Sequence, residues 1–328
     1  MKRADMKRIV TLDPRTYQRH LIHGEGRVWA ETNCYVDLWI ELLHALGHEP
    51  IAALPFTLAI DFEGDQWTFF KFPLSDLYEL YGLDVQELAI WRPLVDHVGE
   101  QVGRGRPVLV ELDSFYLPDT AGTAYKQGHV KTTVAVNEID IEAKHLGYFH
   151  NQGYFHLDGD DFIDIFRLRG SPDPAMLPPY VEFVKIRDGA RLESKALLET
   201  SLRLLRKQLS LLPTANPFGR FKTRLEKDLE WLMQGSIEDF HQYSFATLRQ
   251  YGACYELSAT YLRWLASQGQ SGLDEAVAGF AFLSENTKVF QFQLARATSR
   301  RKALDLTPID DMAARWEQAM SSLKTRYL

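Results

Sequence analysis

A single helix organises the chain, and it is expected at Glu31-Thr32-Asn33-Cys34-Tyr35-Val36-Asp37-Leu38-Trp39-Ile40-Glu41-Leu42-Leu43-His44-Ala45-Leu46-Gly47. Thr32 or Asn33 can supply an N-cap oxygen, and Gly47 is a stop signal. This placement puts Cys34 in the first turn.

Most of the circumference of this helix is apolar. Only Asp37, Glu41 and His44 are polar between Tyr35 and Leu46, and their spacing of four and three residues places them on one narrow stripe. A helix that is apolar on its other faces is buried on most sides. We therefore expect it at the centre of its domain.

Cys34 stands where a cysteine nucleophile would gain most from a helix. Free backbone N–H groups and the positive end of the helix dipole favour a thiolate over a thiol, and the same amides can donate to a developing oxyanion. The alternative is a cysteine that only packs, because free cysteines are among the most buried residues.

The composition restricts the classes of protein that need to be considered. A chain of 328 residues predicts two domains, and a hydrophobic fraction of 45% is enough for a sizeable core. No apolar run reaches the roughly 18 residues of a membrane span, and we expect a cytoplasmic protein. The net charge of −7 argues against nucleic acid as the main partner. Two cysteines 220 positions apart predict neither a disulfide framework nor a metal site, so we expect no bound metal.

Three strands are expected after the helix, at 108–113, 129–136 and 145–150. They follow a helical stretch at 83–102 that is expected to be interrupted at Pro93. His129 opens the second strand, and the turn at Asn151 follows the third. The chain order is therefore a cysteine at a helix start, a histidine at a strand start, and a polar residue after the next strand. This is the order of a papain-like site, in which a helix packs on a small antiparallel sheet.

The run Gly105-Arg106-Pro107-Val108-Leu109-Val110-Glu111-Leu112-Asp113-Ser114-Phe115-Tyr116-Leu117-Pro118, followed by His129, resembles the family of butirosin biosynthesis protein H. Asn33-Cys34 at a helix start fits the same pattern, and the resemblance covers roughly residues 25–170. It implies a papain-fold acyltransferase that moves an aminoacyl group from a carrier-protein thioester to an amine. The whole chain also looks like a bacterial family of unknown function found beside amino-acid:carrier-protein ligases.

On this resemblance Cys34 is the nucleophile, His129 the general base and Asn151 the residue that orients the imidazole, with Asn33 as an oxyanion donor. The third strand of the family usually ends in Asp-Pro, where this chain has His150-Asn151, so His150 and Asp140 remain alternatives to Asn151. The residues expected to line the acyl pocket are Asp113, Tyr116, Tyr125 and His150.

A proline-rich joint from Pro172 to Pro179 divides the chain into a papain-like domain at 1–171 and a helical domain at 172–328. The second domain is expected to be all helical, which makes the fold class α+β. Its helices are expected at 192–211, 217–233, 237–251, 253–268, 273–298 and 308–327. Cys254 also starts a helical run, but no strand-borne histidine follows it, so we expect it to pack.

Basic residues on the first two of these helices could receive an acidic carrier protein and the phosphate of its phosphopantetheine arm. These candidates are Arg203, Arg206, Lys207, Arg220 and Lys222. The alternative is a solvated face held by ion pairs along the helix. No cofactor of the chain's own is expected; the expected partners are an acyl or aminoacyl carrier protein and a small amine.

Two other functions remain open from the sequence. A cysteine peptidase or amidase on the same fold would use the same acyl-enzyme. A non-catalytic interaction protein with a degenerate papain-like domain would keep Cys34 and His129 apart.

Overall fold

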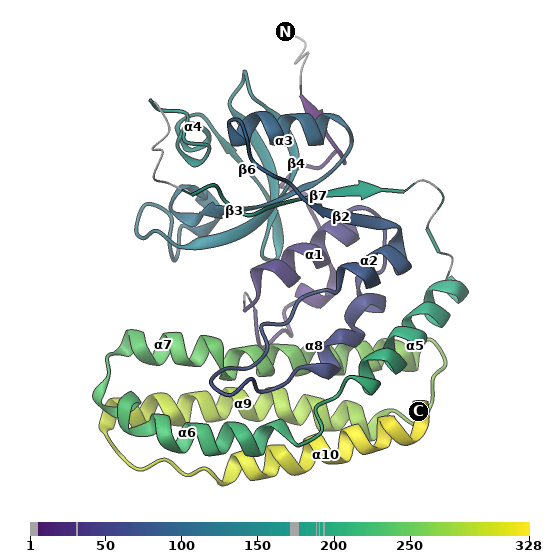
Figure 1. Cartoon of the computed structure of the whole chain (residues 1–328), viewed down its shortest axis with the longest axis vertical. Coiled ribbons are helices and arrows are strands. Elements are labelled where there is room, and N and C mark those ends of the chain that lie inside the picture. The colour runs from purple at the N-terminus through teal and green to yellow at the C-terminus, as the bar shows by residue number, and fades with distance from the viewer. Residues whose placement is uncertain (1–5, 31, 171–176, 188, 190, 193) are drawn as a thin grey trace. The chain divides into compact units, whose positions relative to one another are not determined.

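A computed structural model describes residues 6–30, 32–170, 177–187, 189, 191–192 and 194–328 (Figure 1). The chain forms two compact units, and each unit is built from three stretches that alternate along the sequence. The sheet unit comprises Met1–Leu21, Asn33–Pro50 and Leu77–Arg191, and the helical unit comprises Ile22–Thr32, Ile51–Asp76 and Leu192–Leu328.

The helix predicted at 31–47 is present as α1 (Cys34–Ala45), and local chemistry sets both of its ends. Asn33 is the N-cap, and its side-chain oxygen accepts a hydrogen bond from the Val36 amide at 3.1 Å. At the other end Gly47 has a positive φ of 77°, and the His48 amide donates to the Leu43 carbonyl at 2.9 Å. A glycine in this conformation is the usual end of a helix.

Two of the three residues in the polar stripe of α1 are buried rather than exposed to solvent. Asp37 and Glu41 are both 0% exposed. The Glu41 carboxylate accepts a hydrogen bond from the Tyr17 hydroxyl at 2.5 Å and another from the His20 amide at 3.1 Å. The segment before α1 therefore satisfies part of the stripe, as buried polar groups require.

Within the described residues, the sheet unit has one antiparallel sheet of seven strands. Six strands follow the order β2-β7-β3-β4-β5-β6, and β1 pairs with β4. The strands are β1 (Lys7–Arg8), β2 (Leu83–Glu87), β3 (Val108–Asp113), β4 (Lys131–Asp140), β5 (His145–His150), β6 (Gly153–Asp158) and β7 (Val181–Ile186).

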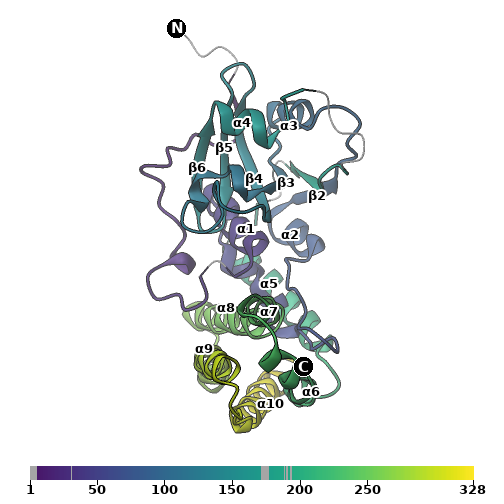
Figure 2. The same ribbon diagram turned by 90° about the vertical axis from the view of Figure 1, so that its left-hand side faces the viewer.

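The two faces of this sheet carry different helices. One face packs its apolar side chains with α3 (Leu94–Gly103) and α4 (Asp160–Ile165), and the cluster includes Val110, Val134 and Tyr148. The opposite face meets α1, which packs on β4, β5 and β6. Figure 2 shows α1 beneath the sheet and α4 on its other side.

The C-terminal part of the helical unit is helical throughout its described elements, as predicted. Its helices are α5 (Ser194–Ser210), α6 (Pro217–Gln234), α7 (Ile237–Ala246), α8 (Leu248–Ser267), α9 (Asp274–Arg300) and α10 (Thr307–Tyr327). Figure 2 views α6, α8, α9 and α10 nearly end-on, so their axes run roughly parallel or antiparallel. Cys254 is buried on α8, and its thiol donates to the Thr57 carbonyl at 3.2 Å, so this cysteine packs as predicted.

Two strands correct the sequence-based prediction. The stretch at 83–102 was expected to be helical, but 83–87 forms β2, and only 94–103 is the helix α3. β7 lies beyond the boundary predicted at 171/172, and it pairs with both β2 and β3. The sheet unit therefore extends past the proline-rich joint, because β7 supplies ladder hydrogen bonds in the middle of the sheet.

Candidate functional site

The first turn of α1 presents Cys34 as its first residue, and the cysteine is only partly buried. Asn33, which was expected to be an oxyanion donor, uses its side-chain oxygen to cap the helix. Asn33 itself is 1% exposed, so it fixes the backbone at Cys34 from inside the structure. The geometry assigns Asn33 a positioning role at the start of the helix.

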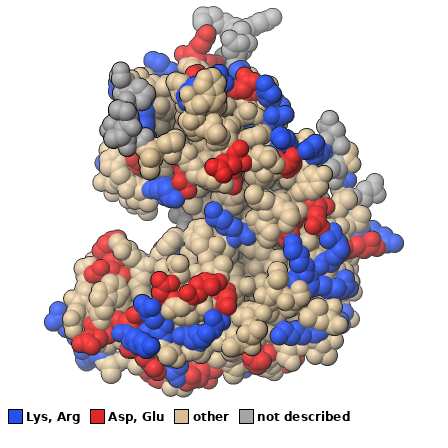
Figure 3. All heavy atoms as spheres, viewed as in Figure 1, with Lys and Arg blue, Asp and Glu red and all other residues tan. Residues whose placement is uncertain are grey.

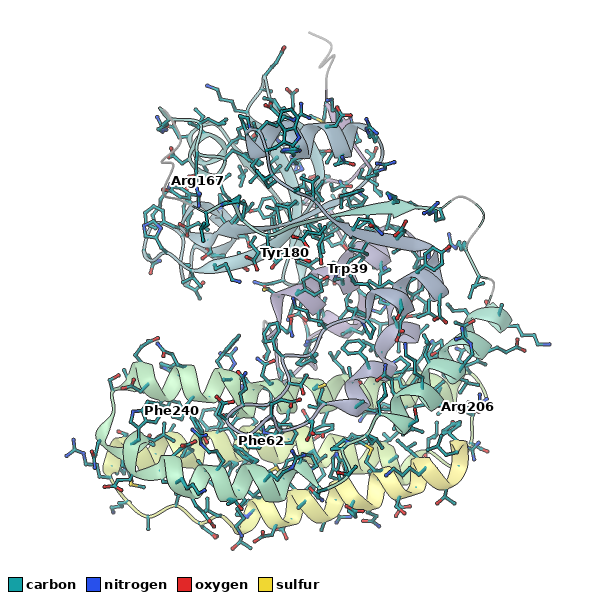
Figure 4. All side chains as sticks on the ribbon, in the orientation of Figure 1. Trp39, Phe62, Arg167, Tyr180, Arg206 and Phe240 are labelled. Atoms are coloured by element: carbon teal, nitrogen blue, oxygen red, sulfur yellow. The ribbon has the colours of Figure 1, made fainter. Side chains whose placement is uncertain are left out.

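Two tyrosines and a glutamate connect this turn to the sheet. The Glu182 carboxylate of β7 accepts hydrogen bonds from the hydroxyls of Tyr35 and Tyr180, each at 2.9 Å. Burial, followed by the bond to Glu182, raises the pKa of Tyr180 to about 12, so both groups remain donors at neutral pH. Figure 4 labels Tyr180 below the sheet, on the side where Trp39 of α1 lies.

Sequence reasoning missed this link between the first turn of α1 and the sheet, because Glu182 lies about 150 residues further along the chain than Cys34. The signal that could have found them is the apolar run Val181-Glu182-Phe183-Val184, in which Glu182 is the exception.

His129 lies two residues before β4 and is held by Asp113, the last residue of β3. The His129 Nδ1 is 2.6 Å from Asp113 Oδ2, and Asp113 Oδ1 accepts a hydrogen bond from the Phe115 amide at 3.0 Å. The imidazole stacks on the Phe115 ring, with centroids 4.4 Å apart and planes 14° apart. The Phe115 amide therefore holds the Asp113 carboxylate in the position from which it orients the histidine. The imidazole is oriented in this way even though 67% of the His129 side chain is exposed.

Cys34 and the His129–Asp113 pair belong to the same face of the sheet. Glu182, which anchors the Cys34 turn, is paired in register with Leu109. The Leu109 side chain shares a face with Asp113, four residues along the same strand, because side chains alternate with a period of two. In the described part of the chain, however, no hydrogen bond joins the Cys34 thiol to the His129 imidazole.

The partner of His129 is thus Asp113, which was expected either to line the pocket or to cap its own loop, and not Asn151. Asn151 has a φ of +46° and lies in the two-residue turn between β5 and β6. Asparagine tolerates this left-handed conformation, so Asn151 serves as a residue of the turn that was expected after the third strand. Asp140 lies at the far end of β4 from His129.

His150 is on the other face of the sheet, next to Tyr148 of the apolar cluster. Its Nδ1 is 2.5 Å from Asp119 Oδ2, and its Nε2 is 2.8 Å from the Thr132 hydroxyl. The Tyr148 hydroxyl donates to the same Asp119 carboxylate at 2.5 Å. His150 is therefore a satisfied core histidine rather than part of the candidate site.

The two loop tyrosines have different surroundings. The ring of Tyr116 lies 6.4 Å from the His129 ring, so it does form part of the wall beside the imidazole. Tyr125 instead donates to Asp161 of α4 at 2.8 Å. Lys126 pairs with the same carboxylate at 2.7 Å and lies 4.9 Å from the centroid of the Tyr116 ring.

Comparison with known protein families identifies both halves of the chain. The DUF1839 N-terminal domain matches residues 18–186, and the DUF1839 C-terminal domain matches residues 194–325. The chain belongs to the DUF1839 family. No curated protein matches it.

In this DUF1839 protein, Lys207, Lys222 and Arg220, which were considered for carrier docking, form ion pairs within the helical unit. Lys207 pairs with the buried Asp76 at 2.8 Å, and Lys222 pairs with Asp310 at 2.6 Å. Arg220 pairs with Asp61 and donates to the Phe62 carbonyl at 2.8 Å. These three cations therefore hold segments of the helical unit together.

The other two cations, Arg203 and Arg206, are exposed on α5. Figure 3 shows Lys and Arg gathered over α5, whereas basic and acidic residues alternate along α6. In the described residues, no helix of this DUF1839 protein is both long enough and apolar enough to cross a membrane.

Proposed function

We propose that this DUF1839 protein is a cysteine-dependent acyl or aminoacyl transferase of the papain-like type. Cys34 is the nucleophile, His129 the general base, and Asp113 the residue that orients the imidazole. The observation that carries the proposal is the His129–Asp113 pair, which belongs to the face of the sheet on which α1 presents Cys34. In a catalytic triad a carboxylate orients the histidine that acts as the base. A histidine that only packs does not need such a partner.

The proposed reaction proceeds in two balanced steps. His129 takes the proton of the Cys34 thiol, and the thiolate attacks the carbonyl carbon of a thioester. The bond from that carbon to the donor sulfur breaks, and the donor thiol leaves with the proton. An amine then attacks the acyl-Cys34 thioester, losing a proton to His129, and the Cys34 thiol is released as the amide forms.

The residues that hold Cys34 and His129 in place have defined tasks in this scheme. The backbone N–H groups at the start of α1 donate to the oxyanion, and the Asn33 cap fixes the turn that presents them. Tyr35 and Tyr180 hold the turn against the sheet through Glu182. Phe115 fixes the plane of the His129 ring by stacking.

A carrier-protein thioester is the donor that suits this chemistry. Exchange between a thiol and a thioester is close to thermoneutral, so the acyl-enzyme forms without a large change in free energy. A phosphopantetheine thioester carries an anionic phosphate, and its carrier is acidic, which suits the exposed Arg203 and Arg206 on α5.

The test is intact-mass spectrometry after the protein is mixed with an aminoacylated carrier protein, with Cys34→Ser alongside. We expect a mass gain equal to the aminoacyl group in the native protein and none in Cys34→Ser. Adding a small amine should then discharge the adduct as an amide. If the adduct discharges only to water, the protein is a hydrolase. If no adduct forms and iodoacetamide also modifies Cys34 slowly, Cys34 is not a nucleophile.

A further inference from the structure

A second cluster of reactive side chains lies in the sheet unit, away from Cys34. Glu138, His145 and His156 come from the adjacent strands β4, β5 and β6, which Figure 2 shows side by side. One ligand atom from each lies within 4.8 Å of the others. Glu138 Oε1 is 2.8 Å from His145 Nε2 and 3.3 Å from His156 Nε2.

A β-bulge brings these groups together. Val136 pairs with Tyr148, but Glu138 pairs with Gly147, so β4 has one extra residue at Asn137. Without this extra residue Glu138 would share the face of Val136, which belongs to the apolar cluster. The bulge turns the carboxylate to the opposite face.

A glycine leaves the space that the cluster occupies. Gly147 pairs with Glu138 on one side and with His156 on the other. A Cβ at Gly147 would lie 2.6 Å from Glu138 Cγ and 2.2 Å from the Tyr154 hydroxyl. Any larger residue would therefore displace the carboxylate from between the two imidazoles.

The hydrogen bonds around the cluster resemble those around metal ligands. The second nitrogen of His145, Nδ1, is 2.6 Å from Asp158 Oδ1. A carboxylate on the far nitrogen fixes the tautomer and the orientation of a ligating imidazole. His156 Nε2 is buried, and within the described residues it has no aligned hydrogen-bond partner.

We propose that Glu138, His145 and His156 bind one divalent transition-metal ion, with Asp158 positioning His145. Two imidazoles and one carboxylate are a donor set of catalytic zinc and of non-haem iron(II), and they leave coordination positions open. Donor atoms about 2.1 Å from a tetrahedral ion lie about 3.4 Å apart. The separations of 2.8 and 3.3 Å reach this value with small side-chain movements.

The open positions have access to a cavity in the same unit. Glu138 and His156 line a hollow of about 450 Å³, together with Arg8, Asp13 and Arg15. This volume admits water and a small ligand beside the ion. The cluster lies at the end of β4 opposite His129, since Glu138 is seven positions beyond Lys131, a distance of about 20 Å along the strand. The metal site is therefore independent of the proposed cysteine chemistry.

The experiment is a calorimetric titration of tag-free, chelator-treated protein with Zn²⁺, repeated with Co²⁺ and followed by absorption. We expect one equivalent to bind, and we expect His156→Ala to weaken binding by at least about 100-fold. Asp158→Asn should weaken binding by about 10- to 100-fold, because removing the carboxylate that orients a ligating histidine usually weakens metal binding by this factor. The matched control is His241→Ala, which removes an exposed histidine of α7 and should leave binding unchanged.

Circular dichroism establishes that each variant is folded. His156 is a suitable site because 28% of its side chain is exposed, and Asp158→Asn gives the same comparison if His156→Ala unfolds. Cys34→Ser should bind the ion as the native chain does, which separates this result from the test of the nucleophile. The absence of saturable binding, or equal affinity in the folded cluster variants and the native chain, would overturn the proposal.

Discussion

His129 Nδ1 is bound to Asp113 Oδ2 at 2.6 Å, so the carboxylate fixes which face and which nitrogen the imidazole offers. With the proton on Nδ1, Nε2 is the nitrogen left to accept a proton. Asp113 is itself held, because its other oxygen accepts from the Phe115 amide. This arrangement orients a base even though the histidine is largely exposed.

Asp113→Asn should therefore slow acylation of Cys34 without unfolding the sheet. The amide would donate to Nδ1 and stabilise the wrong tautomer, which costs up to about 10⁴-fold in enzymes whose catalytic histidine is oriented in this way. The measurement is the rate of adduct formation with an aminoacylated carrier protein. Asp161→Asn is the matched control, because Asp161 contacts Tyr125 and Lys126 rather than His129. Equal rates for Asp113→Asn and the native chain would remove Asp113 from the mechanism.

Asn33→Ala should destabilise the sheet unit by about 1 kcal/mol, with an upper value of about 2 kcal/mol, because the Val36 amide loses its cap. Asn33→Ser keeps an oxygen that can accept the same hydrogen bond, so it should lose less stability than Asn33→Ala. Urea unfolding followed by circular dichroism measures the difference. If the alanine and serine variants unfold at the same urea concentration, the cap contributes nothing beyond side-chain volume.

The two cysteines should react at very different rates with iodoacetamide. Burial raises the pKa of the Cys254 thiol well above its usual range, and its sulfur is enclosed in the helical unit. Cys34 is partly exposed at a helix start. Peptide mapping should find Cys34 modified in the native protein, and Cys254 only after denaturant is added. Early labelling of Cys254 would contradict this burial.

Much of the fold follows from local sequence signals. The bounds of α1 follow from Asn33 and Gly47, and β3 and β5 have the predicted bounds. Most helices beyond residue 194 begin and end within a few residues of their predicted positions. These elements are long, or have a capping residue, or show a clear alternation of apolar and polar residues. Each can therefore be recognised from its own sequence.

The elements that were missed depend on partners distant in the chain. Apolar and polar residues alternate in β2 from Leu83 through Val85. A pattern of only five residues beside a helical stretch, however, does not distinguish a helix from a strand. β7 follows four prolines and gains its place only by pairing with β2 and β3. For the same reason the Asp113 contact and the Glu138 cluster could not be predicted, since strand register decides which side chains meet.

Gly252→Ala should destabilise the helical unit, whereas Gly219→Ala should not. A Cβ at Gly252 on α8 would lie 2.4 Å from the Trp29 ring, which is 1% exposed and cannot easily move. Overpacking of this kind costs about 1–3 kcal/mol. Gly219 on α6 has no atom within 4 Å of its Cβ position, so alanine should be neutral or stabilising there. Thermal unfolding of the two variants makes the comparison, and equal melting temperatures would contradict the close packing of Trp29.

His48 should make the protein less stable as the pH falls from about 6.5 to 4. Burial, followed by the charge of Arg191, lowers the pKa of His48 to about 4, and its ring lies 4.8 Å from that of Tyr81. In the unfolded chain the pKa is about 6.5, so the unfolded state binds the extra proton in this window and gains up to about 3 kcal/mol. Above pH 6.5 both states are neutral and the effect vanishes.

His48→Gln removes the group that takes up this proton on unfolding. The free energy of unfolding of the variant should therefore fall less steeply than that of the native chain as the pH is lowered. Carboxylates titrate in the same range, and the comparison therefore rests on the difference between the two proteins in urea unfolding at each pH. His241→Gln on the exposed face of α7 is the control and should follow the native curve. If His48→Gln also follows the native curve between pH 6.5 and 4, His48 is protonated in the folded protein and does not oppose acid unfolding.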